Sequence, residues 1–169
     1  FFKMLSAHEL FGFMPPALAS EMLETAYELD RDNYRITVSA VAEARKLRPA
    51  FFERKPRLER HAEMITMLRK PRRDAAASNL IRVWLLKKHT QMLKDFLDAL
   101  GITHNEGVVD DLPETIDDAK LKNAVETLLS KYPKEEVAVY LNAFYSMNEV
   151  SWFNLKSILE TEPRLQLMG

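Results

Sequence analysis

The stretch that decides the fold is DAAASNLIRVWLLKKHTQMLKDFLDALGI, residues 74–102. Apolar side chains return along it every three or four positions, a spacing that places them on one side of an α-helix. Gly101 followed by Ile102 is typical of a helix that ends at a left-handed glycine, with a hydrophobic contact just beyond it. We therefore predict one long helix over 74–100, about 40 Å in length at roughly 1.5 Å per residue. Its predicted buried side consists of Ile81, Trp84, Leu85, Met92, Phe96 and Leu100.

The same helical spacing extends over the rest of the chain, bounded by capping residues and prolines. Ser6 and Glu9 have the S-x-x-E spacing of a capping box, and Pro16 suits the first turn of a second helix. The connection that follows Pro49 carries Phe51 and Phe52, which we expect to fill a gap between helices. No stretch has a defensible β-strand pattern. The sequence thus predicts an all-α bundle of about seven to eight helices, of which 74–100 is the longest.

The length of 169 residues fits one ordinary domain. The loop 101–116 is the one candidate boundary, because it would separate a five-helix part from a three-helix part. Three short helices alone would form a marginal core. We therefore expect a single helical domain over 1–169, with 101–116 as the place of any subdivision.

Composition excludes several classes of chemistry. The chain has no cysteine, which excludes disulfide scaffolds, thiolate catalysis and cysteine-based metal sites. It has four glycines, and neither GxGxxG nor GxxxxGK occurs, so common nucleotide-binding loops are not expected. No apolar run approaches about 18 residues, and no signal-peptide pattern is present. We expect a cytoplasmic protein that does not associate with membranes, has no cofactor and is not an enzyme.

Charge is distributed unevenly along the chain. Residues 45–73 hold eleven lysines and arginines against three glutamates, a net charge of +8, while the whole chain has a net charge of −1. Such a segment could bind phosphates or an acidic partner, or pair with the chain's own acidic segments. A pI of about 6.5 argues against a dedicated nucleic-acid binder. The candidate anion-binding or partner-binding residues are those in its two tightest clusters: Arg54, Lys55, Arg57, Arg69, Lys70, Arg72 and Arg73.

Histidines and methionines provide the other candidates. His89 is in register with the apolar stripe of 74–100, so we expect a core or edge position, and it is the best candidate for a functional histidine. Trp84, His89 and Met92 could line an adaptable pocket for a small molecule. No metal is expected, because the helical ligand spacing H-x-x-x-H is absent and the oxygen-rich loop after His104 lacks the EF-hand spacing.

Three functional hypotheses follow. The leading one is a non-catalytic helical module for protein–protein interaction or scaffolding, with a protein partner or a second copy of the chain bound. The second is binding of nucleic acid or another polyanion through 45–73. The third is a small-molecule-sensing pocket near Trp84 and His89.

Overall fold

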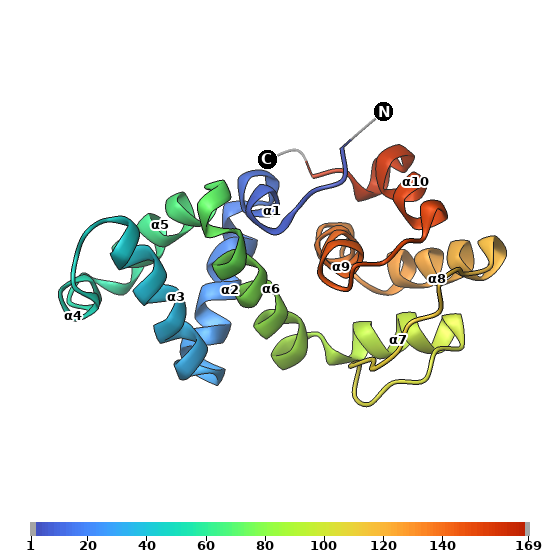
Figure 1. Ribbon diagram of the computed structural model, residues 1–169, viewed down its shortest axis with the longest axis horizontal. Helices are drawn as coiled ribbons and strands as arrows, with labels where there is room; N and C mark the ends of the chain where they lie inside the picture. The colour runs from blue at the N-terminus through green and yellow to red at the C-terminus, as the bar shows by residue number, and fades with distance from the viewer. Residues whose placement is uncertain (1–2, 168–169) are drawn as a thin grey trace. The chain divides into compact units, whose positions relative to one another are not determined.

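A computed structural model describes residues 3–167, and in this part of the chain the regular elements are all helices, with no strand (Figure 1). The predicted all-α fold is confirmed. The described residues form ten α-helices rather than seven to eight. Their bounds are α1 Ala7–Phe13, α2 Pro16–Leu29, α3 Arg31–Ala44, α4 Pro49–Glu53, α5 Arg57–Leu68, α6 Asp74–Lys88, α7 Thr90–Leu100, α8 Asp118–Lys131, α9 Lys134–Met147 and α10 Phe153–Thr161, with short 3-10 turns η1 at Pro71–Arg73 and η2 at Pro163–Leu165.

The chain divides into two compact units. The N-terminal unit is Ser6–Lys87, and the C-terminal unit consists of Lys88–Leu167 together with residues 3–5. The division therefore lies between Lys87 and Lys88 rather than in the loop 101–116. One domain over 1–169 stays a prediction. Among the described residues, no helix is long and apolar enough to cross a membrane.

The predicted helix over 74–100 is two helices, α6 and α7, separated at His89. The backbone of His89 has φ −125° and ψ 29°, outside the helical range, and a new hydrogen-bond ladder begins when Leu93 N–H bonds to the His89 carbonyl at 3.2 Å. Apolar residues keep their spacing across this point, so periodicity alone does not reveal a break of one residue. α7 ends as the sequence indicates, with Gly101 at φ 71°.

A second difference lies in the connection after Pro49, which contains the short helix α4. Phe52 is fully buried, as expected, but Phe51 has 56% of its surface exposed. In a helix of five residues, neighbouring side chains point in directions about 100° apart, so both rings cannot face the core. The expectation that both fill a gap is wrong for Phe51.

The N-terminal unit packs α2, α3 and α5 against one another, with α1 and α4 at the ends of α5. Polar contacts hold these helices at defined points. The capping box at Ser6 is present, since its N–H donates to the Glu9 carboxylate at 3.1 Å. His8 then joins α1 to the start of α6, because its backbone N–H donates to Asp74 Oδ1 at 3.0 Å. Trp84 is fully buried, and its Nε1–H donates to Glu21 Oε2 at 2.9 Å, which joins α6 to α2.

The C-terminal unit has an aromatic core. Phe96 packs edge-to-face on Tyr140 and Phe144, with ring centroids 5.5 and 5.3 Å away. Trp152 completes the cluster 5.5 Å from Phe144, and its Nε1–H donates to the Pro113 carbonyl at 2.8 Å. These contacts tie the long loop between α7 and α8 to the core.

Candidate functional site

The seven predicted cationic residues separate into two groups at opposite ends of α5. The first group lies just before α5 and in its first turn, and the second follows the last turn and continues through η1. A helix of twelve residues is about 18 Å long. The basic segment 45–73 is therefore two separate clusters rather than one concentrated patch.

Three of these cations take part in contacts within the N-terminal unit. Lys55 pairs with Glu63 at 2.9 Å, and Arg57 pairs with Glu24 at 3.3 Å. Arg69 Nε donates to the Phe11 carbonyl at 3.2 Å, which fixes α1 against the end of α5. Within residues 3–167, no ion pair involves the remaining members of the set: Arg54, Lys70, Arg72 and Arg73.

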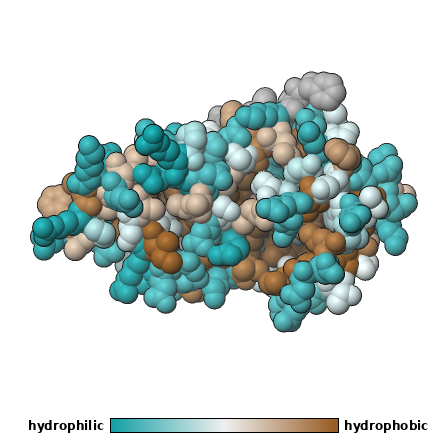
Figure 2. Space-filling model, viewed as in Figure 1, coloured by the Kyte–Doolittle hydropathy of each residue, from teal (hydrophilic) through white to brown (hydrophobic). Residues whose placement is uncertain are grey.

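Apolar side chains are exposed at the start of α5, next to the first cationic group. Leu58 has 85% of its surface exposed and Phe51 has 56%. Arg54 and Arg57 lie between them in the sequence, and both are exposed. We call these four residues the α4–α5 surface. In Figure 2, apolar side chains are visible among hydrophilic ones at the α4 end of the N-terminal unit.

A buried polar network lies behind this surface. Arg60 Nε donates to the Tyr34 hydroxyl oxygen at 2.7 Å, and the same oxygen is 2.8 Å from His61 Nε2. His61 Nδ1 lies 3.4 Å from Glu24 Oε1, and an imidazole proton on Nδ1 suits this contact with a carboxylate. In that tautomer His61 Nε2 accepts the proton of the Tyr34 hydroxyl, whose oxygen accepts from Arg60.

Arg60 is the one charged member of this network of Tyr34, Arg60 and His61. Burial lowers the pKa of His61 to about 4, and the nearby charges of Arg60 and Arg57 act in the same direction. Burial also raises the pKa of the Tyr34 hydroxyl, so both groups are neutral at pH 7.

The guanidinium of Arg60 is bonded to neutral acceptors alone. The residue is 7% exposed, and its Nη1 donates to the backbone carbonyls of Glu53 and Lys55 at 2.9 and 3.0 Å. Within the described part of the chain, no carboxylate oxygen lies within 4.0 Å of Arg60. The N-terminal unit thus contains a buried cation without a counter-ion.

A small cavity opens beside this cation. Its volume is about 150 Å³, and it is lined by Tyr27, Arg31, Tyr34, Arg35, Glu53 and Arg60. Arg31 lies over the Tyr27 ring at 3.8 Å from the centroid, and its Nε donates to the Tyr27 carbonyl at 2.8 Å. We call this hollow the Arg60 cavity. Two arginines of α3 and one of α5 are among the residues that line it.

Sequence reasoning missed most of the Arg60 cavity. Arg60 is counted among the cations of 45–73, and Tyr34 belongs to a predicted apolar stripe, so neither stands out. Arg31 and Arg35 are four residues apart on one helix and share a face, which is the one signal that could have been found. Their proximity to Arg60 depends on the packing of α3 against α5, which local patterns do not encode.

The predicted pocket residues lie in two different units. Trp84 belongs to the N-terminal unit, while His89 and Met92 belong to the C-terminal unit. Met92 is fully buried, and His89 Nδ1 lies 3.4 Å from Glu136 Oε1. The Arg60 cavity and three hollows of the C-terminal unit are lined by other residues, so a small-molecule pocket at these three positions stays a prediction.

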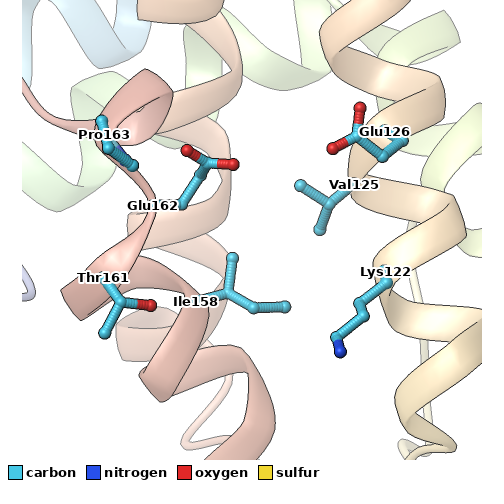
Figure 3. A pocket seen from close by; sticks show the side chains of 7 residues that line it. All are labelled: Lys122, Val125, Glu126, Ile158, Thr161, Glu162 and Pro163. Atoms are coloured by element: carbon cyan, nitrogen blue, oxygen red, sulfur yellow. The ribbon is translucent and has the colours of Figure 1, made fainter.

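The C-terminal unit has larger hollows of a different character. One, of about 440 Å³, lies between α8 and the end of α10, with Glu126 and Glu162 on opposite walls (Figure 3). Arg164 bonds to both carboxylates and thereby lowers the pKa of each, so both carboxylates already have a cationic partner. Two others, of about 630 and 370 Å³, are lined mainly by the loop between α7 and α8. The larger of these two is lined by Asp110, Glu114 and Glu149, which are exposed, whereas the charge of Arg60 is buried.

Within residues 3–167, no three histidine, aspartate or glutamate side chains come together in a way that could hold a metal ion. Comparison with known proteins finds no matching family model, no similar curated protein and no similar solved structure. The function of the chain therefore has to be inferred from the contacts, burial and charge of its own side chains.

Proposed function

We propose that the chain is a non-catalytic helical interaction module whose N-terminal unit binds an acidic and apolar segment of a partner protein on the α4–α5 surface. The observation that supports this most is the exposure of Leu58 and Phe51 beside Arg54 and Arg57. An apolar side chain covered by a partner contributes about 1.5–3 kcal/mol. Aromatic and arginine side chains are also enriched among the residues that dominate binding energies.

Charge supports an acidic partner. Segment 45–73 has a net charge of +8 within a chain of net charge −1, so acidic groups are attracted to this part of the molecule. Arg54 has no ion pair in the described residues, so it can bond to a carboxylate without first breaking an internal contact. Arg57 would exchange or share its contact with Glu24.

A protein segment fits this surface better than a nucleic acid does. Glu59 is exposed in the same turn of α5 as Leu58, so the surface is mixed in charge and partly apolar. A phosphate backbone would be repelled by Glu59 and would leave Leu58 uncovered. The second cationic group is about 18 Å away along α5 and adds nothing to a compact site.

Selection from a random peptide library on the full chain tests the proposal. We expect the selected peptides to combine Asp or Glu with Leu, Phe or Trp. Leu58→Gln should weaken binding of a selected peptide about tenfold, and Arg54→Gln about threefold to tenfold. The matched control is Ile36→Gln, which removes an exposed apolar side chain from α3 and should change the affinity less than twofold.

Three outcomes would overturn the proposal. One is selection of peptides without acidic residues. Another is equal weakening by Leu58→Gln and Ile36→Gln. The third is tighter binding of a single-stranded oligonucleotide than of any selected peptide, with no loss on Leu58→Gln, which would favour the polyanion hypothesis. Light scattering after size exclusion, at low and high salt, distinguishes self-association from binding of a different protein.

A further inference from the structure

We infer that the Arg60 cavity is a binding site for a phosphoryl group, either free phosphate or a phosphate monoester. This goes beyond the proposed function and does not rest on it. Of the six residues that line the cavity, two belong to the basic segment 45–73, and none belongs to the α4–α5 surface.

Arg60 is a buried cation without a counter-ion in the described residues. A buried charge is costly unless it is paired with an opposite charge or fully hydrogen-bonded. Nε and Nη1 of Arg60 are bonded to neutral oxygens, while Nη2 has no bonding partner in the described part of the chain and is accessible to solvent. Because Arg60 lines the cavity, an anion there would supply the missing charge and accept from Nη2.

The residues that line the Arg60 cavity have a net positive charge. Arg31, Arg35 and Arg60 contribute +3 and Glu53 contributes −1, which leaves +2. A phosphate monoester carries about −1.5 to −2 at pH 7. The Glu53 carboxylate has no ion pair with these arginines within 4.0 Å, so it does not already neutralise them. A dianion with several acceptor oxygens matches this lining better than a single carboxylate does.

The volume of the Arg60 cavity suits a small anion. Pockets for drug-sized ligands have volumes of about 300–1,000 Å³. At about 150 Å³, the Arg60 cavity is too small for such a molecule but large enough for one tetrahedral anion, five times the roughly 30 Å³ that a water molecule occupies in the liquid. The remainder of a monoester would extend outward past Arg31 and Arg35, both of which are exposed.

A purely structural role for Arg60 would explain its own hydrogen bonds but not the other two arginines that line the cavity. Its bonds to Tyr34, Glu53 and Lys55 hold α3 and the end of α4 in place, and they need no other arginine. That role does not account for Arg31 and Arg35, which stand around the same space. The two roles therefore differ in what they predict for variants of Arg31 and Arg35.

Isothermal titration of the full chain with inorganic phosphate at pH 7.5 and low ionic strength tests the inference. We expect saturable binding with one site, and at least tenfold weaker binding in the double variant Arg31→Gln, Arg35→Gln. The matched control is Arg45→Gln with Arg72→Gln, which removes the same charge from exposed positions outside the cavity and should weaken binding less than twofold. Thermal unfolding of each variant without phosphate confirms that it is folded.

Titration with O-phosphoserine distinguishes the two sources of the phosphoryl group. Tighter binding than inorganic phosphate assigns the site to a monoester, and weaker binding assigns it to the free ion. If neither inorganic phosphate nor O-phosphoserine shows saturable binding at concentrations up to about 20 mM, the inference is overturned. Equal weakening by the cavity and control variants would also overturn it, because the effect would then be general charge screening. Neither result would affect the α4–α5 surface.

Discussion

Acidification should destabilise the N-terminal unit through one residue, His61. Its side chain is 4% exposed, and its Nε2 accepts the proton of the Tyr34 hydroxyl. Protonation of this nitrogen would place two donors against each other, close to the charges of Arg60 and Arg57. Glu24, at 3.4 Å from Nδ1, is the one nearby group that would favour the imidazolium, and it is shared with Arg57.

The size of the effect follows from the pKa of His61 in the two states. It is about 4 in the folded protein and 6.5 in the unfolded chain, so the unfolded chain binds the proton more readily. Stability is therefore unaffected above pH 6.5, falls as the pH drops from 6.5 towards 4, and stops falling below 4. At about 1.4 kcal/mol for each pH unit between these values, the full loss is about 3 kcal/mol. That is a large share of a total stability of about 5–15 kcal/mol.

Urea unfolding at several pH values between 7.5 and 4 measures this loss, followed by Trp84 fluorescence in a Trp152→Phe background so that the signal reports the N-terminal unit. His61→Gln retains an acceptor for the Tyr34 hydroxyl but does not titrate, so the wild type should lose about 3 kcal/mol more than this variant over that range. Equal loss in wild type and His61→Gln would refute the reasoning.

Three further perturbations have defined outcomes. Arg60→Met should lower the free energy of unfolding by about 2–4 kcal/mol in urea titrations, because the buried Tyr34 hydroxyl oxygen and two partly buried carbonyl oxygens lose their donor. Gly107→Ala should lower the free energy of unfolding by about 2–3 kcal/mol, since the φ of Gly107 is +84° and the new Cβ would lie 2.8 Å from Leu93 Cβ. Gly101→Ala, the comparison, should lower it by about 1 kcal/mol, because the φ of Gly101 is +71° but the space around it is open. Asn142→Leu should destabilise the C-terminal unit by about 1–3 kcal/mol, measured by Trp152 fluorescence, because the buried Leu5 N–H loses its acceptor.

Local signals in the sequence predicted most of the helices. Pro16 begins α2, the capping box of Ser6 precedes α1, and Gly101 ends α7, each at the expected position. These signals depend on neighbouring residues, so they are readable without the tertiary structure. The break at His89 was not predicted, because it does not interrupt the apolar spacing and has no side-chain cap. The helix α4 begins with Pro49 in its first turn, as α2 does with Pro16, but five residues are too few to show an apolar period.

The candidate sites were predictable in part. Charge counting identified Arg54 and Arg57, and the ion pair of Arg57 with Glu24 then distinguished it from Arg54, which has no ion pair in the described residues. Leu58 has the helical spacing of a buried apolar residue relative to Ile65 and Leu68, but its position in the first turn of α5 leaves it in solvent. The environment of Arg60 depends on residues 26 positions away, and contacts at that separation are set by how the helices pack.

The central claim is that the α4–α5 surface is where a partner binds. Amide and side-chain NMR spectra of the full chain, recorded during titration with a library-selected peptide, test it most directly. We predict that the largest shift changes occur at Phe51, Arg54, Arg57 and Leu58, and that they saturate together. Shift changes centred on η1 or on the C-terminal unit, with the α4–α5 resonances unmoved, would contradict it.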